Sequence, residues 1–405
     1  MEKFRQFNLN YCDLNTMLEN LDFLLRISNV KINKNNDQPI HKIFIIIWFL
    51  GIICYYYAYA VSLVWFVVVK YPVTGDFNTP CILFSILACS HLSFVNMFYI
   101  MIYKEKLQNL IQRCLDFNKI VKPGTMFSKN LHNQLRYIKK RASIVWVAMF
   151  MNAVFYALVP FAIPGRHLPE DKQVIYGLDP IFESPNYEIA FVILSFGIYI
   201  CGLFFANVTA LTLVILGYVE AQLLALTTEL QNLWEHAEIF YETHALTIHD
   251  HNIKNKIKNI FINECLKEIA LFHILNINII RKFEDIFRGT KAVALISTIL
   301  AIISELLGGI ETTYLQITYT LVVVFTETYA GQKLIDASIK FEKGVYSCNW
   351  ENFDSNNMKI IATILPSAQK TMNITAGGVT VLDYCCFFAV IKFSYSVYNT
   401  LRLQV

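Results

Sequence analysis

Residues 189–219 read IAFVILSFGIYICGLFFANVTALTLVILGYV, and this stretch decides the fold. It contains no Asp, Glu, Lys or Arg. A helix needs about 20 mainly apolar residues to cross the hydrocarbon core of a bilayer, so the segment is long enough to span a membrane. The composition agrees, because 55% of the residues are hydrophobic and only 16% are charged, whereas soluble domains carry roughly 25% charged residues.

Six further segments have the length of a membrane-spanning helix. Three of them lack charged residues altogether: 43–69, 77–103 and 144–164. The other three carry one or two charged residues each: 290–310, 312–332 and 379–401. The gaps on one side of the predicted bundle are too short to supply the polar shell of a globular domain. We therefore predict a single all-α integral membrane domain with seven transmembrane helices, extending over residues 1–405.

Basic residues set the orientation of this bundle. Of the 34 Lys and Arg residues, 28 fall in alternate gaps and only four fall in the opposite gaps and the C-terminal tail. Since basic residues are retained on the cytoplasmic side, we expect a cytoplasmic N-terminus and an extracellular C-terminus. The first 42 residues show no secretory signal peptide. The ten cysteines fall in or beside spans or on the cytoplasmic side, so no extracellular disulfide is expected.

Amphipathic sequence continues from the spans into the cytoplasm. After the fourth span, residues 221–240 read AQLLALTTELQNLWEHAEIF. One helix from Glu188 to Phe240 would be roughly 80 Å long, far more than a bilayer requires. The amphipathic pattern recurs later in the chain, so we predict that segments 220–289 and 333–371 pack together as a cytoplasmic anchor.

The outer surface is small except for the gap 165–188. This gap holds two basic and five acidic residues. We consider it a candidate lid over the outer end of the bundle, and the alternative is a solvated connector.

The sequence contains no motif of enzyme chemistry. It has no G-x-G-x-x-G, Walker loop, C-x-x-C pair or H-E-x-x-H helix, so we predict neither an enzyme nor a cofactor. His244, His249 and His251 form the one histidine cluster, but a metal site needs fixed geometry and further ligands, so none is predicted. The formal charge of +3 is spread along the chain and does not indicate nucleic-acid binding.

Several motifs in the last third of the chain carry a family resemblance. They are ALFH (270–273), YAGQKL (329–334), YSCNW (346–350), SAQK (367–370), Ala376-Gly377 and IKFSYSVYNTL (391–401). In their order and spacing they resemble the insect odorant receptor family. The chain departs from the family pattern at Thr371, where Pro is frequent, and at SYSVY, where SYSYF is common.

This resemblance implies a ligand-gated, non-selective cation channel that is a tetramer around a central pore. This chain would be the odorant-tuning subunit beside a shared co-receptor, in the plasma membrane of an olfactory sensory neuron dendrite. The resemblance also implies that the last helix lines the pore, that the cytoplasmic helix ends form the anchor, and that a small volatile odorant binds in the outer half of each subunit.

The predicted pore helix, 379–401, contains two ionisable residues. Asp383 and Lys392 lie about 180° apart on a helix, so they cannot pair with each other. A cation pore tolerates Asp better than Lys. We therefore propose that one stripe faces the pore, comprising Asp383, Phe387, Val390, Ser394, Val397 and Leu401. Alternatively, this stripe packs against neighbouring helices and Asp383 bonds a partner on the cytoplasmic side.

The predicted pore helix also contains a lysine and is preceded by two glycines. Lys392 is expected to pack inward against polar groups of its own subunit. Gly377 and Gly378 precede the helix, where they provide either a hinge or close helix packing.

Aromatic and small residues in the outer halves of spans two to six suit a pocket for a volatile ligand. Such a pocket should be mostly apolar with a few polar groups. The candidate ligand-binding residues are Phe84, Cys89, Phe150, Asn152, Phe155, Tyr156, Phe196, Ile200, Ser304, Tyr314 and Tyr319. The alternative for each is ordinary packing within the membrane or at its interface.

Three other protein classes compete with the odorant receptor interpretation. A gustatory receptor acting as a homomeric channel would end its last helix in a TYxxxxxQF pattern, whereas this chain ends SYSVYNTLRLQV. A G-protein-coupled receptor places its N-terminus outside the cell, against the distribution of basic residues. A secondary transporter would show inverted repeats with broken helices, and the sequence has neither.

Overall fold

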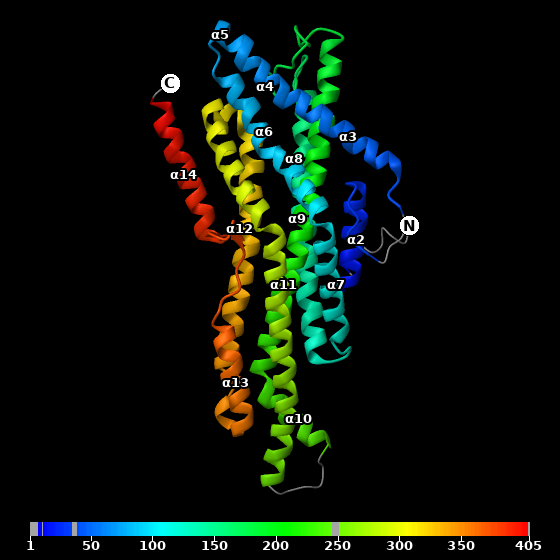
Figure 1. Ribbon diagram of the computed structural model, residues 1–405, viewed down its shortest axis with the longest axis vertical. Coiled ribbons are helices and arrows are strands. Elements are labelled where there is room, and N and C mark those ends of the chain that lie inside the picture. The colour runs from blue at the N-terminus through cyan, green and yellow to red at the C-terminus, as the bar shows by residue number, and fades with distance from the viewer. Residues whose placement is uncertain (1–6, 10, 35–38, 245–250, 404–405) are drawn as a thin grey trace.

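The computed structural model describes residues 7–9, 11–34, 39–244 and 251–403, which form a long bundle of helices (Figure 1). Its helices are α2 (Leu14–Ile27), α3 (Lys42–Tyr56), α4 (Ser62–Trp65), α5 (Tyr71–Thr74), α6 (Asn78–Ile102), α7 (Lys104–Ile120), α8 (Met126–Ala162), α9 (Asn186–Gln231), α10 (Leu233–His244), α11 (His251–Gly308), α12 (Ile310–Tyr346), α13 (Ser355–Ala368) and α14 (Tyr384–Arg402). Wider helical turns, Tyr57–Val61 and Phe66–Lys70, join α3, α4 and α5, and a short 3-10 turn, Trp350–Asn352, precedes α13.

Among the described residues, five helices are long and apolar enough to cross a membrane. They are Lys42–Thr74, Asn78–Ile102, Met126–Ala162, Asn186–Gln231 and Ile253–Gly308. These helices correspond to the first five predicted spans, of which the second, third and fifth extend one or two residues past the helix ends. The sixth predicted span lies within α12 and most of the seventh within α14. Neither α12 nor α14 is among the five helices; α12 carries Glu327 within the predicted sixth span, and α14 carries Lys392 within the predicted seventh.

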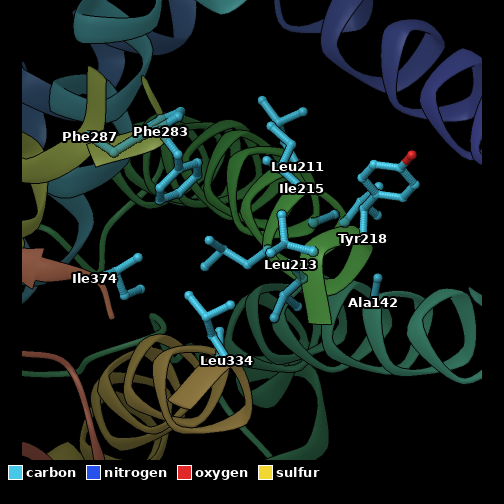
Figure 2. Packing of buried hydrophobic residues seen from close by; sticks show 14 of the residues in the cluster. Ala142, Leu211, Leu213, Ile215, Tyr218, Phe283, Phe287, Leu334 and Ile374 are labelled. Atoms are coloured by element: carbon cyan, nitrogen blue, oxygen red, sulfur yellow. The ribbon is translucent and has the colours of Figure 1, made fainter. Parts of the chain in front are cut away.

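Helix α9 forms the centre of the bundle. Every residue from 204 to 223 is buried, because α9 is covered by α8, α12, α3 and α6. Figure 2 shows Leu211, Leu213 and Ile215 of α9 packed among side chains from neighbouring elements, including Phe283 of α11 and Leu334 of α12. A helix segment that is apolar on all sides must be buried in protein or in lipid, and here protein surrounds the middle of α9.

Two glycines let α8 approach α9 closely. A Cβ atom on Gly202 would lie 2.6 Å from the Cβ of Ala153. A Cβ atom on Gly217 would overlap Ile138 in the same way. The α8–α9 contact therefore requires glycine at both points.

The helices extend beyond the predicted spans, with one interruption. Helix α8 begins at Met126, well before the predicted start at residue 144, and α11 runs for 58 residues, about 87 Å. The expected continuous helix from Glu188 to Phe240 is wrong in one respect, because it breaks at Asn232 between α9 and α10. Asn232 leaves the helical conformation (φ −99°, ψ 5°), which suits the low helix propensity of asparagine.

A small hairpin precedes α14 where a hinge or close helix packing was expected. Strand β1 (Thr375–Ala376) pairs antiparallel with β2 (Thr380–Val381). The strands are joined by residues 377–379, and Gly377 and Gly378, with φ of +67° and +79°, are the central residues of a turn closed by the bond from the Val379 N–H to the Ala376 carbonyl at 3.2 Å. Positive φ at both positions favours glycine in such turns. The backbone N–H of Gly377 also donates to the carbonyl of Arg288, which ties the hairpin to α11 (2.9 Å).

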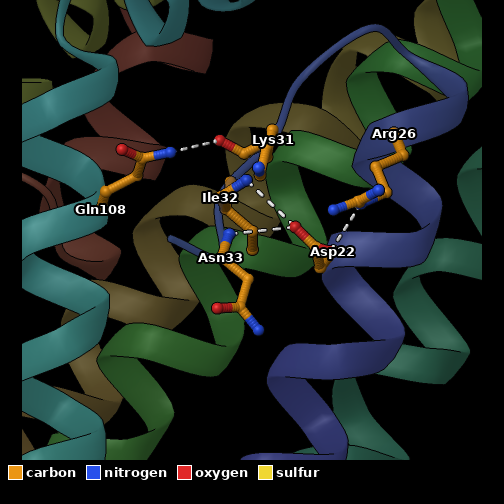
Figure 3. A network of polar contacts seen from close by, with 6 residues as sticks. All are labelled: Asp22, Arg26, Lys31, Ile32, Asn33 and Gln108. Carbon is orange, nitrogen blue, oxygen red and sulfur yellow. Dashed lines mark hydrogen bonds and ion pairs between the residues drawn. The ribbon is translucent and has the colours of Figure 1, made fainter. Parts of the chain in front are cut away.

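A polar network docks the N-terminal helix α2 onto the bundle (Figure 3). The Asp22 carboxylate pairs with Arg26 at 2.7 Å and accepts the backbone N–H groups of Ile32 and Asn33. The side-chain amide of Gln108, on α7, donates to the carbonyl of Lys31 at 3.0 Å. These bonds fix the turn after α2 and hold it against α7.

Candidate ligand cavity beneath a loop

A small cavity lies between four helices, toward the end of the bundle where loop 163–185 runs. It is lined by Ile86, Cys89 and Ser90 of α6, by Asn152, Ala153 and Tyr156 of α8, by Ile198, Cys201 and Gly202 of α9, and by Leu315, Gln316 and Tyr319 of α12. The cavity encloses about 50 Å³ of open space, which is room for a few water molecules. An organic ligand therefore fits only when these side chains move apart.

The loop 163–185 is packed into this end of the bundle. Leu168, Glu170, Gln173 and Ile175 are at most 7% exposed. The Tyr187 hydroxyl donates to the carbonyl of His167, at 3.0 Å. The middle of this loop, which corresponds to part of the predicted gap 165–188, therefore packs onto the helices, whereas residues at both ends of the loop are exposed.

Glu170 connects the loop to the wall of the cavity. Its Oε1 accepts hydrogen bonds from Nε2 of Gln316, at 2.6 Å, and from the Tyr156 hydroxyl, at 3.3 Å. The Ser85 hydroxyl in turn donates to Oε1 of Gln316 at 2.7 Å. Burial raises the pKa of the Glu170 carboxyl group to about 7, because the charged form loses its hydration. One loop residue is thus bonded to α8 and α12, and through Gln316 to α6.

A second carboxyl group lies behind the cavity wall. Glu305, on α11, is fully buried, and its Oε1 accepts a hydrogen bond from the Thr320 hydroxyl at 2.7 Å. The same hydroxyl lies 3.2 Å from the sulfur of Cys89, which lines the cavity. The other oxygen, Oε2 of Glu305, has no hydrogen-bond partner in the described part of the chain. An unpaired buried oxygen is unfavourable and is available for a polar group that enters the site.

The structure brings together four of the eleven residues proposed from the sequence as ligand contacts. Cys89, Asn152, Tyr156 and Tyr319 line the cavity. The remaining seven lie elsewhere: Ile200 and Ser304 are buried outside the lining, Phe150 and Phe196 are half-buried, and Phe84, Phe155 and Tyr314 are exposed. Tyr314 and Phe155 have more than half of their surface uncovered, at 52% and 57%.

Two polar residues at the cavity were not selected from the sequence. Gln316 was missed because an uncharged amide within an apolar span carries no strong signal. Glu170 was missed because a loop has no periodicity that shows which of its residues point inward. The five acidic residues of the gap 165–188 were a compositional hint, but they did not single out Glu170.

The structure buries part of the pore stripe that was proposed on helix α14. Val390 and Ser394 are buried against the chain's own helices, whereas Val397 is half-buried and Leu401 is 37% exposed. Asp383 is the N-cap of α14, where its Oδ1 accepts the backbone N–H of Cys386 at 2.7 Å.

Lys392 of α14 also lies in a different environment from the one predicted. The inward position expected for Lys392 is wrong, because its side chain is exposed. Phe388 and Tyr395 are exposed with it, so this face of α14 is left uncovered by the single chain.

Two ion pairs are buried farther along the bundle. Lys291 of α11 bonds Glu327 of α12 at 2.6 Å, with side chains 8% and 12% exposed. Arg141 of α8 bonds Glu220 of α9 at 2.6 Å and lies over the ring of Tyr329.

In the parts of the chain that the structure describes, no group of three or more His, Cys, Asp or Glu residues is arranged to hold a metal ion. The histidine cluster falls partly outside the described residues, since His249 lies between 245 and 250.

Comparison with known proteins gives consistent matches. The family model described as 7tm odorant receptor matches residues 76–395. Odorant receptor Or2 of Anopheles gambiae is 25% identical over 266 residues, which cover 64% of this chain and 67% of the relative. Two structures of the insect olfactory receptor OR5 from Machilis hrabei, the second in complex with eugenol, match with TM-scores of 0.73 and 0.72 at 12% and 13% identity, covering 96% of this chain and 98% of theirs. At such low identity this likeness concerns the fold alone.

Proposed function

The chain belongs to the insect odorant receptor family, and from this premise we propose that it is the odorant-tuning subunit of a ligand-gated cation channel. It is a multi-pass, all-α membrane protein with the 7tm odorant receptor fold, and members of this family are receptors rather than enzymes. In the proposed assembly it joins a shared co-receptor in a tetramer, in the plasma membrane of an olfactory neuron.

We place the ligand, a small volatile molecule, in the cavity beneath loop 163–185. The observation that carries this proposal is the cavity itself, which is lined by four helices and covered by a loop with buried side chains. Its walls are mostly apolar with a few polar groups, as expected for a small-molecule site. The structurally similar OR5 has been solved in complex with eugenol, a small volatile phenol. Cys89, Asn152, Tyr156 and Tyr319 are the proposed ligand contacts.

Helix α12 provides a physical connection from this cavity to α14. Near its start it contributes Gln316 and Tyr319 to the cavity. Farther along, Oε1 of Gln332 accepts the backbone N–H of Tyr384, the first residue of α14, at 3.4 Å. A ligand that displaces α12 by even a fraction of an ångström therefore moves the beginning of α14, since packed helices shift as units.

We further propose the arrangement in the membrane. The N-terminus lies in the cytoplasm, as the basic residues indicate, and segments 220–289 and 333–371 form the anchor between subunits. The pore is lined by the helix within segment 379–401. Because Val390 and Ser394 are covered by the chain's own helices, the face available to the pore and to neighbouring subunits is the one that carries Phe388, Lys392 and Tyr395.

Two-electrode recording from oocytes tests this function. The chain is expressed with and without an odorant receptor co-receptor, and surface labelling confirms delivery of each. Eugenol and a panel of volatile esters, alcohols, aldehydes and amines are applied. A cation current that requires both chains is expected, whereas current from this chain alone contradicts the tuning-subunit assignment. Silence from surface-expressed pairs across the panel contradicts the channel function.

A further inference from the structure

Two buried carboxyl groups flank the ligand cavity. Glu170 bonds Gln316 and Tyr156, which line it, and Glu305 bonds Thr320, which lies against Cys89 in the wall. Gln316 and Thr320 are one helical turn apart on α12, a rise of about 6 Å. The two carboxyl groups are therefore bonded to neighbouring turns of α12, and both lie behind the residues that line the cavity.

Neither carboxyl group has a cationic partner. No described Lys, Arg or His side chain forms an ion pair with Glu170 or Glu305. Elsewhere in the same bundle buried acids are paired, as Glu220 is with Arg141 and Glu327 with Lys291. Buried carboxylates are normally compensated by a partner of opposite charge. The cavity is therefore the place in the described bundle where two buried carboxyl groups lack such a partner, and an ammonium ion would supply it.

The remaining lining suits a cation with an apolar tail. The rings of Tyr156 and Tyr319 border the cavity, and ammonium groups are attracted to the faces of aromatic rings. Asn152 adds a side-chain amide oxygen that can accept a hydrogen bond. Ile86, Ile198 and Leu315 supply apolar wall for a short hydrocarbon chain. No Lys, Arg or His lines the cavity to repel a positive ligand.

We propose that the ligand of this receptor is a small volatile amine, bound as its ammonium ion between Glu170 and Glu305. This inference rests on the proposed function and names the chemical class of its odorant. The ammonium donates to the unpartnered Oε2 of Glu305 and to the Glu170 carboxylate, while the hydrocarbon part replaces water in the apolar remainder of the cavity. Since the empty cavity is narrow, short amines fit better than long ones.

Recordings with a matched pair of odorants test the proposal. 3-Methylbutylamine and 3-methylbutanol have nearly the same shape and differ in charge. With receptor and co-receptor coexpressed, the half-maximal concentration for the amine is expected to be at least about tenfold lower than for the alcohol, since charge-assisted hydrogen bonds are the stronger ones. Equal sensitivity to both, or a preference for the alcohol, overturns the amine assignment and leaves the odorant receptor function intact.

Charge-neutralising variants assign the effect to the two carboxyl groups. Glu170→Gln and Glu305→Gln are each expected to raise the half-maximal amine concentration about tenfold or more, while the response to the alcohol stays within about twofold. Glu183→Gln is the matched control, because Glu183 lies in the same loop and its side chain is exposed. An unchanged amine response in both cavity variants overturns the proposal, as does an equal loss in the Glu183 variant.

Thermal unfolding of the purified wild-type chain separates ligand class from channel function. A ligand that binds only the folded state raises the unfolding temperature. 3-Methylbutylamine is expected to raise it, and 3-methylbutanol at the same concentration is expected to raise it less. If oocytes give no current but the amine alone stabilises the protein, the channel proposal fails and the amine site stands. If the amine gives no stabilisation, the amine site is overturned.

Discussion

Gly331, in the YAGQKL segment of α12, faces the chain that leads into α14. A Cβ atom at this position would overlap the carbonyl oxygen of Leu382 and lie 3.1 Å from its carbonyl carbon and 3.3 Å from Cγ1 of Ile374. The first obstacle is backbone, which cannot rotate away as a side chain can. Gly331→Ala must therefore push the hairpin away from α12.

The expected change in stability is the balance of two effects. Alanine in place of glycine inside a helix gains about 1 kcal/mol of helix propensity, whereas overpacking a tight contact loses about 1–3 kcal/mol. The net effect of Gly331→Ala is therefore a loss of up to about 2 kcal/mol. Gly289→Ala on α11 is the matched control, because the nearest atom to its Cβ would be the Tyr99 hydroxyl at 3.5 Å, an ordinary contact.

Fluorescence-monitored melting of the purified receptor measures both variants. Gly289→Ala is expected to melt at or above the wild-type temperature, and Gly331→Ala below it. In oocytes Gly331→Ala is also expected to reduce the odorant current, because the beginning of α14 is displaced. A Gly331→Ala receptor that melts and conducts like the Gly289→Ala control refutes the packing argument.

Three further outcomes follow from buried polar groups. Lys291→Met leaves Glu327 buried without its partner and is expected to destabilise the receptor by about 3–5 kcal/mol. The double variant Lys291→Met with Glu327→Leu is expected to recover monodisperse protein in size-exclusion chromatography. Equal yields of monodisperse protein from the single and double variants contradict this. Asn207→Leu removes the acceptor of Trp146 and the donor to Ser28, so the melting temperature should fall by an amount equivalent to about 1–3 kcal/mol, and an unchanged melt contradicts this. The pKa of Glu170 is raised from 4.5 to about 7, so the unfolded chain ionises first as pH rises. Glu170 therefore destabilises the folded state increasingly between about pH 4.5 and 7, by about 3 kcal/mol in all, and not below that range. After correction for the intrinsic exchange rate, which rises with pH in any peptide, the protection of backbone amides in loop 163–185 should fall over this range in the wild type but not in Glu170→Gln, and parallel profiles contradict the assignment.

The apolar helices were predictable from the sequence because lipid imposes a simple rule on them. The uncharged stretch 189–219 needs either lipid or protein on every side, and the structure buries its middle within the bundle. The first five predicted spans each match, to within two residues at either end, part of a helix that is long and apolar enough to cross a membrane. The hairpin at Gly377 and Gly378 was not predicted, because two adjacent glycines fit a hinge and a tight turn equally well before the pairing of β1 with β2 is known.

The candidate site was only partly predictable. Tyr314 and Tyr319 were both selected by residue type and by their predicted depth in the membrane. Five residues along a helix rotate the side chain by about 140°, so Tyr314 is exposed whereas Tyr319 lines the cavity. The stripe through Val390 and Ser394 was assigned to the pore from charge alone, whereas tertiary packing covers it. Sequence periodicity shows which residues share a face, but not what that face contacts.

The most direct measurement of the central claim, that an odorant binds beneath loop 163–185, is a comparison of two tyrosine variants on α12. Tyr319→Ala alters the cavity wall, whereas Tyr314→Ala removes a ring that is 52% exposed. Odorant dose-response curves are recorded for both variants with the co-receptor, at matched surface expression. A shift of about tenfold or more in half-maximal concentration is expected for Tyr319→Ala only, since a buried aromatic contact is worth about 1.5–3 kcal/mol. A shift for Tyr314→Ala with none for Tyr319→Ala would place the odorant elsewhere and contradict the account.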